Sequence, residues 1–115
     1  MKKILILIAI SFTTISINAQ SIAGVWNLGE DNTKIEITEN NGVFNGKIIS
    51  SDNSKAKVGS QILKDVKFSN GEGKGKMYAA KKGKWYDATI KEKGNELNVT
   101  IKVGFMSKTL KWKKE

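Results

Sequence analysis

The chain alternates between apolar and polar residues along most of its length. Lys34-Ile35-Glu36-Ile37-Thr38 places both isoleucines on one side of an extended chain, and residues 97–103 continue the same alternation. A period of two is typical of strands with one buried face, and beyond residue 19 no stretch keeps apolar residues at helical spacing for a whole helix. The pattern therefore predicts an all-β protein.

Short groups of Asn, Asp and Gly separate these alternating runs and predict turns. Such residues accept the positive φ angles of tight hairpins, so consecutive strands are expected to be antiparallel neighbours. The longest predicted connection is the polar segment 50–59. The predicted strands cover residues 23–28, 33–38, 43–50, 61–68, 74–79, 84–91, 96–103 and 106–113.

Eight such strands favour a small antiparallel up-and-down barrel of the lipocalin or calycin kind, because closure removes exposed sheet edges. A two-sheet sandwich is the alternative. A barrel of eight strands is either filled by side chains or holds one small ligand, and a large void would cost much of a small domain's stability, so we expect a filled interior. The predicted inward-facing residues are Trp26, Leu28, Ile35, Ile37, Phe44, Ile48, Ile62, Val66, Phe68, Met77, Tyr86, Ala88, Ile90, Leu97, Val99, Ile101, Val103, Leu110 and Trp112.

The first nineteen residues have a different character. Lys2 and Lys3 precede an apolar run that begins at Ile4, and a more polar stretch leads to Ala19. This order is typical of a secretory signal peptide cleaved after Ala19, and the run is shorter than the roughly 20 apolar residues that span a bilayer. We expect an exported protein, periplasmic or secreted and not membrane-spanning, in which residues 20–115 form one monomeric domain.

Composition then narrows the chemistry. The net charge is +9, the chain has no His and no Cys, and all twenty basic residues are lysines. Without imidazole or thiolate there is no ordinary zinc site and no His or Cys for acid–base or nucleophilic catalysis. Without arginine there is no bidentate group for phosphate or guanine. We expect no enzymatic activity, no metal, no cofactor and no nucleic-acid partner.

The lysines often stand two residues apart, so that the two members of a pair share one face of a strand. One interpretation is a solvated exterior that keeps the barrel soluble. The other is an envelope interaction module, whose lysine-rich face docks on an anionic polymer, a membrane surface or a partner protein. The pairs are Lys74 and Lys76, Lys82 and Lys84, Lys91 and Lys93, and Lys111 and Lys113.

Several short motifs, in this order along the chain, resemble an exported bacterial family, domain of unknown function 2147. The chain is shorter than most members at residues 50–59. The resemblance implies a lipocalin-like barrel in which Trp26 plugs one end and Lys111 or Lys113 lies over its ring as a cation. The motifs are Gly24-Val25-Trp26, Lys34-Ile35-Glu36-Ile37, Gly46-Lys47-Ile48-Ile49, Ile62-Leu63-Lys64 with Phe68, Gly83-Lys84-x-Tyr86, Asn95-x-Leu97-x-Val99, and Gly104-Phe105 with Leu110-Lys111-Trp112.

Three large apolar residues remain outside the predicted core. Trp85 falls on the opposite phase of its strand, and Phe105 and Met106 fall at a strand end. Exposed apolar groups of this kind mark binding surfaces when they gather. We therefore expect these three residues to lie at one mouth of the barrel and to bind a small apolar or amphipathic, lipid-like molecule.

Overall fold

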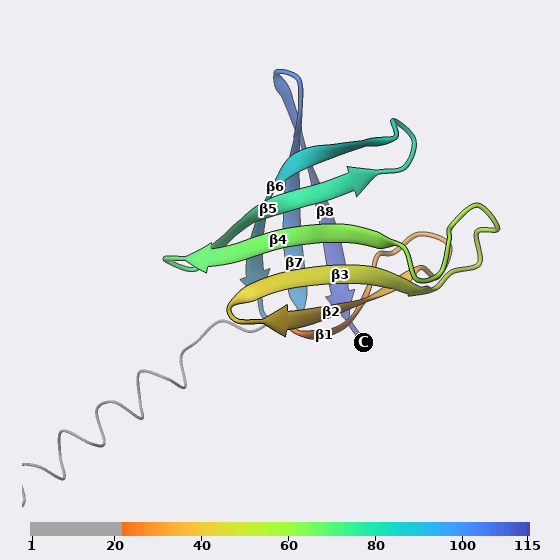
Figure 1. The fold of residues 1–115 in the computed structure, drawn as a ribbon, viewed down its shortest axis with the longest axis horizontal. Coiled ribbons are helices and arrows are strands. Elements are labelled where there is room, and N and C mark those ends of the chain that lie inside the picture. The colour runs from red at the N-terminus through yellow and green to blue at the C-terminus, as the bar shows by residue number, and fades with distance from the viewer. Residues whose placement is uncertain (1–21) are drawn as a thin grey trace, which may run out of the picture.

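The computed structural model describes residues 22–115, so the predicted signal peptide lies outside the described residues. Eight antiparallel strands follow one another around a closed barrel, as Figure 1 shows, which confirms the predicted fold. Within the described residues no helix is long and apolar enough to cross a membrane. The strands are β1 Gly24–Asn27, β2 Lys34–Asn40, β3 Val43–Ser50, β4 Gln61–Ser69, β5 Glu72–Ala79, β6 Lys84–Lys93, β7 Glu96–Val103 and β8 Met106–Lys114.

Apolar side chains fill the barrel, as the alternation predicted. Predicted inward residues that are only partly buried pack against this core from its margins: Leu28, Phe68, Met77, Tyr86, Val103 and Leu110. Two residues of this hydrophobic core, Ile22 and Leu63, were not on the predicted list. The core consists of Ile22, Trp26, Ile35, Ile37, Phe44, Ile48, Ile62, Leu63, Val66, Ala88, Ile90, Leu97, Val99, Ile101 and Trp112.

Strand β4 departs from simple alternation, and this explains Leu63. Asp65 has a φ of 57°, and the pairing of β4 with β5 shifts between Lys64 and Lys67. A β-bulge of this kind inserts one extra residue, so the side chains before and after it reach the same face. Leu63 and Val66 are accordingly both fully buried.

Glycines on the inner face of β5 allow the bulge to approach closely. A Cβ atom on Gly75 would lie 2.6 Å from the carbonyl oxygen of Lys64 and 2.8 Å from Cα of Val66. A Cβ on Gly73 would lie 2.8 Å from Cζ of Phe68. Strand β5 therefore lies directly against β4 and the core at Gly75. A side chain there would collide with backbone atoms, which cannot easily move.

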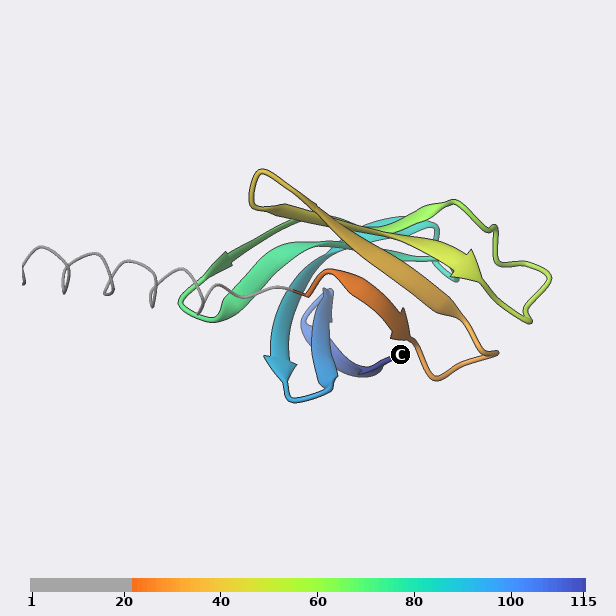
Figure 2. The ribbon, with the colours of Figure 1, turned by 90° about the horizontal axis from the view of Figure 1, so that it is seen from below.

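The two ends of the barrel are built differently. Strands β6 and β7 pair only from Ala88 and Ile101 onward, so residues 84–87 of β6 and 102–103 of β7 have no pairing with each other. The tips of the β5–β6 and β7–β8 hairpins consequently point in different directions in Figure 1, and Figure 2 gives a second view of the same arrangement. At the opposite end β7, β8 and β1 converge around the buried Trp26 and Trp112.

Candidate functional site

Trp26 is fully buried at the closed end of the barrel, the end that holds Ile22, Trp26, Leu97 and Trp112. Its indole Nε1–H donates a hydrogen bond of 2.8 Å to the carbonyl oxygen of Ile22. This bond satisfies the one polar group of the ring inside the core, where an unpaired donor would be costly. Trp26, the residue for which the sequence predicted a plug, is therefore a buried and hydrogen-bonded part of the core.

The cation over the plug is Lys114, whose Nζ lies 5.4 Å from the centre of the Trp26 ring. The predicted candidates, Lys111 and Lys113, lie elsewhere: Lys111 pairs with Asn98 on the outer face, and Lys113 pairs with Asn27 of β1. Strand alternation gives the physical reason. Because Trp112 points inward, the residue two positions on points inward as well, and its neighbours point outward.

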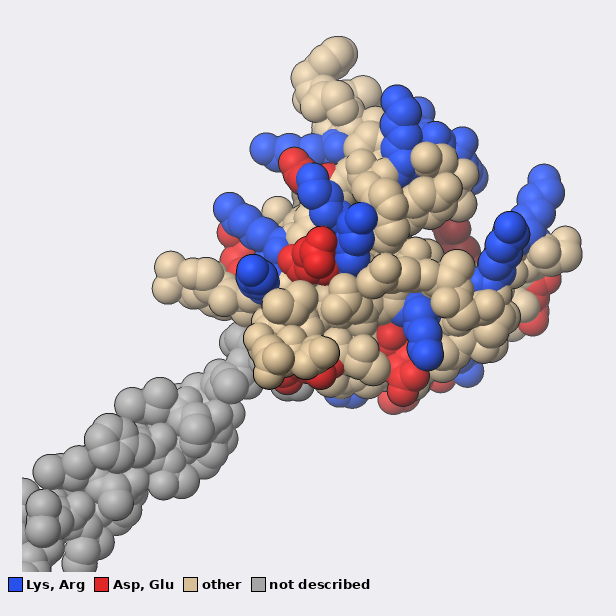
Figure 3. Space-filling view, in the orientation of Figure 1, with Lys and Arg blue, Asp and Glu red and all other residues tan. Residues whose placement is uncertain are grey.

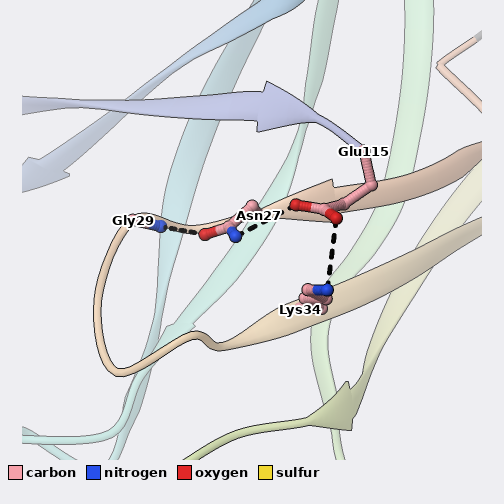
Figure 4. A network of polar contacts seen from close by, with 4 residues as sticks. All are labelled: Asn27, Gly29, Lys34 and Glu115. Atoms are coloured by element: carbon pink, nitrogen blue, oxygen red, sulfur yellow. Dashed lines mark hydrogen bonds and ion pairs between the residues drawn. The ribbon is translucent and has the colours of Figure 1, made fainter.

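A polar clasp closes the seam between the first and last strands (Figure 4). Only two residue pairs join β1 to β8, Trp26 with Lys114 and Asn27 with Lys113. Beside them, the Asn27 side-chain amide donates to Oε2 of Glu115 at 3.0 Å, and Lys34 Nζ lies 3.2 Å from Oε1. The backbone N–H of Gly29 donates to Oδ1 of Asn27 at 2.7 Å.

This clasp favours the charged form of the last residue. The hydrogen bond from Asn27, followed by the bond to Lys34, lowers the pKa of the Glu115 carboxyl below its ordinary value. The clasp thus ties the end of the chain to β1 and β2, where ladder hydrogen bonds are few.

Trp85 lies on the outer face of β6, at the end that carries the 80–83 turn. Its ring contacts that of Tyr78, with centroids 5.3 Å apart, and Lys64 Nζ lies 4.2 Å above the ring. Register places Tyr78 opposite Trp85, while Met77 and Tyr86 form the next pair on the inner face. Trp85 is therefore part of the outer wall rather than the lining of the barrel.

Phe105 and Met106 lie on a different hairpin, at the tip of β7 and β8. Phe105 is fully exposed and Met106 is 67% exposed. The two hairpin tips diverge in Figure 1, so the structure brings Phe105 and Met106 together but does not bring Trp85 to them. In the described structure, Trp85, Phe105 and Met106 do not form the single barrel mouth that the sequence predicted.

Five lysines lie on the outer face of β4–β6. We call this group of lysines the lysine wall. Figure 3 shows lysine side chains gathered over these strands. Cross-strand register places Lys64 opposite Lys76 and Lys67 opposite Lys74. Like charges directly opposite one another across a sheet are destabilising. The lysine wall consists of Lys64, Lys67, Lys74, Lys76 and Lys91.

Two acidic residues partly neutralise the wall. Asp87 accepts a hydrogen bond of 2.6 Å from Lys76, and this bond lowers the pKa of the Asp87 carboxyl below its ordinary value. Glu72 lies 4.0 Å from Lys74 and 3.6 Å from Lys91. Within residues 22–115, Lys67 makes no ion pair. The wall therefore keeps an excess of positive charge.

An open groove runs along this wall at the β4–β5 turn. Its lining combines three lysines and hydroxyl, amide and backbone N–H groups, which can donate hydrogen bonds to an anion, with the carboxylate of Glu72, which cannot. Within the described residues, no group of three or more Asp, Glu, His or Cys residues is placed to hold a metal ion. The residues lining the groove are Lys67, Ser69, Asn70, Gly71, Glu72, Lys74 and Lys91.

Sequence reasoning missed part of this wall. Lys74, Lys76 and Lys91 were recognised as members of spaced pairs, whereas Lys64 and Lys67 were not. Their separation of three residues places two side chains on opposite faces of a regular strand. The bulge at Asp65 restores them to one face.

Together these features define a small, filled β-barrel with a polar clasp at its seam and a cationic outer wall. The family model described as an uncharacterized protein conserved in bacteria (DUF2147) matches residues 24–114. The chain belongs to this family. A comparison with curated proteins finds no match.

Proposed function

We propose that this protein is an exported, non-enzymatic binding module that holds an anionic polymer of the bacterial envelope against its lysine wall. The observation that carries the proposal is the direct opposition of lysines in two adjacent rows, Lys64 with Lys76 and Lys67 with Lys74. This arrangement costs stability in the isolated protein and is relieved when anionic groups lie between the ammonium groups. A surface selected only for solubility has no need of opposed pairs.

A repeating polymer suits the geometry better than a single small anion. Neighbouring strands are ~5 Å apart and alternate residues along one strand ~7 Å apart, so several lysines lie close enough together to contact successive charges of one polymer. Each lysine near an anionic surface contributes about 1 kcal/mol, so binding needs several contacts at once. The absence of arginine favours a polymer of carboxylate, sulfate or phosphate charges over a nucleic acid read by its bases.

The alternative, a small apolar or amphipathic ligand bound at one barrel mouth, has less support. The inner face is occupied by buried apolar side chains, and Gly75 has no room for even one added carbon. Phe105 and Met106 point into solvent at a hairpin tip instead of lining a cavity. These two residues therefore suit an extended surface more than a small enclosed ligand.

The test is binding of the exported protein to dextran sulfate, with neutral dextran for comparison. The double variant Lys67→Gln/Lys74→Gln is expected to bind dextran sulfate at least about tenfold more weakly, at about fivefold per lysine removed. Affinity should also fall steeply with added salt, because the interaction is screened. Affinity can be measured by titration calorimetry or by elution from an immobilised column.

The matched control is Lys81→Gln/Lys82→Gln, which removes the same charge from the exposed 80–83 turn. This control should lose much less affinity than the wall variant. Equal losses in both variants, or binding that persists in half-molar salt, would contradict a defined electrostatic site on the wall.

A further inference from the structure

The tip of the β7–β8 hairpin stands clear of the barrel. We call residues 102–108 the projecting ribbon. Its two arms pair with each other, Lys102 with Ser107 and Val103 with Met106, whereas the pairing of β7 with β6 ends at Ile101. On the other side, β1 pairs only with Lys113 and Lys114 of β8. Within residues 22–115, no third strand extends the sheet along the ribbon.

Polarity changes in order along this ribbon. Phe105 and Met106 at the tip are two of the three large hydrophobic residues exposed in residues 22–115, and Val103 beside them is half-buried. Immediately below come Lys102 and Lys108, both exposed. Register pairs Lys102 with Ser107, and both lie on the outer face. Lys108 lies opposite Ile101, on the inner face. Lysines therefore flank the apolar tip on both faces of the ribbon.

We propose that the projecting ribbon docks tip-first on an anionic lipid bilayer. Two residues of strand extend ~7 Å, which matches the roughly 5–10 Å depth at which apolar groups lie in the headgroup region. At this depth Phe105 and Met106 meet acyl chains. Lys102 and Lys108 keep their ammonium groups at the level of the phosphates, with their aliphatic stems along the apolar layer.

Charge complementarity selects a bilayer over a second copy of the chain. A copy placed against the ribbon would bring its own Lys102 and Lys108 toward those already there. A fully exposed aromatic ring is unfavourable in water. An anionic bilayer would bury the Phe105 ring among acyl chains and attract both lysines to its headgroups. In Figure 3 the tip is a tan projection, with blue lysine side chains gathered below it.

The apolar tip of the projecting ribbon lies on a different hairpin from the lysine wall on β4–β6, so its docking goes beyond the proposed function. Lys102, at the base of the ribbon, lines one groove with Lys74 of the wall and with Asp87. Substitutions at Phe105 and Met106, which leave every lysine in place, therefore separate membrane docking from polymer binding.

The test is sedimentation with vesicles made from equal parts of phosphatidylglycerol and phosphatidylcholine, with pure phosphatidylcholine vesicles for comparison. The protein is purified from an expressing bacterium in its naturally processed form. Phe105→Ser/Met106→Ser should lower partitioning onto the anionic vesicles at least about tenfold. Lys102→Gln/Lys108→Gln should lower it about tenfold or more on the anionic vesicles and leave the weak binding to phosphatidylcholine unchanged.

The 51–60 loop provides matched controls, because it carries the third exposed hydrophobic residue, Val58, together with the exposed Lys55 and Lys57. Val58→Ser should leave vesicle binding unchanged, and Lys55→Gln/Lys57→Gln should lower it much less than the ribbon variant. Phe105→Ser/Met106→Ser should bind dextran sulfate like the unmodified protein, which separates this proposal from that for the wall.

The proposal is overturned if the unmodified protein does not bind the anionic vesicles, or if Phe105→Ser/Met106→Ser binds them equally well. It is also overturned if sedimentation without lipid reveals a dimer that this double variant abolishes, because the tip would then be a self-association surface. Circular dichroism of each variant establishes that the barrel is intact, and all the substituted positions are exposed.

Discussion

Strands β7 and β8 run through both ends of the molecule and have opposite roles at the two ends. At the closed end Leu97 and Trp112 face each other and are buried with Trp26. At the other end the same two strands continue as the projecting ribbon, with Phe105 fully exposed. One hairpin thus supplies core packing along one half and a solvent-exposed surface along the other. Stability is concentrated in the first half, which leaves the second free to vary for binding.

The two ends should respond most differently when one large aromatic side chain is truncated at each. Trp112→Ala should lower the free energy of unfolding by about 3–5 kcal/mol, because it leaves a cavity in the core. Phe105→Ala should change it by no more than about 0.5 kcal/mol, because its ring is already in water. Urea denaturation followed by circular dichroism measures both.

Trp112→Phe serves as a milder substitution if the alanine variant does not fold. It should destabilise the protein by less than Trp112→Ala and by clearly more than Phe105→Ala. Similar values for Trp112→Phe and Phe105→Ala would contradict the division between a packed half and an exposed half.

A second substitution tests how tightly the interior is packed beneath the β4 bulge. Gly75→Ala should lower the free energy of unfolding by about 1–3 kcal/mol, since the added carbon meets backbone atoms that cannot easily move. The control is Gly46→Ala, where the nearest atom is Cβ of Leu63 at 3.3 Å. We expect Gly46→Ala to lie within about 1 kcal/mol of the unmodified protein, because contacts of 3.3 Å and longer require a shift of only a few tenths of an ångström and glycine is itself unfavourable in strands. Thermal unfolding measures both variants. Equal stability of Gly75→Ala and Gly46→Ala would contradict tight packing beneath the bulge.

The polar clasp at the seam gives a smaller effect. Asn27→Ala removes the acceptor for Gly29 N–H and a donor to Glu115, so we expect a loss of about 1 kcal/mol. Thr109→Val, at the base of the ribbon, removes the contact of 3.0 Å between the hydroxyls of Thr100 and Thr109. This exposed pair should matter less, by no more than about 0.5 kcal/mol. A larger loss for Thr109→Val in chemical denaturation would mean that the seam is not where the barrel is secured.

The lysine wall extends the comparison to the outside of the barrel and predicts a change of opposite sign. Lys67→Gln/Lys74→Gln removes one opposed pair and should raise the free energy of unfolding by about 0.2–1 kcal/mol while weakening polyanion binding. Lys81→Gln/Lys82→Gln, in a turn, should leave stability unchanged. Differential scanning calorimetry at low ionic strength is the measurement. A loss of stability in the wall variant would mean that these lysines serve the fold rather than a ligand.

The fold was predictable because the alternation of apolar and polar residues is nearly unbroken and because turns rich in Gly, Asn and other polar residues separate the strands. Where regular alternation fails, sequence reasoning fails with it. The extra residue at Asp65 moved Leu63 into the core and brought Lys64 and Lys67 to one face. No local property of these residues distinguishes a bulge from a regular strand before the partner strand is known.

The site residues were predictable only in part, for a different reason. Alternation from Trp112 identifies Lys114 as the inward-facing lysine, so the cation over Trp26 was within reach of the sequence. The separation of Trp85 from Phe105 was not, because it depends on where the pairing of β6 with β7 ends. That point depends on the pairing of two strands, and the alternation within either strand does not mark it.

Amide hydrogen exchange along β7 and β8, followed by nuclear magnetic resonance, tests the division of this hairpin most directly. Exchange is slow where a backbone amide opens only with global unfolding, and fast where a local opening suffices. The amides of Leu97, Val99 and Trp112 should be protected to near the full free energy of unfolding, whereas those of Val103 and Met106 should exchange through local opening. Equal protection from Leu97 to Met106 would contradict a packed half and an independent projecting ribbon.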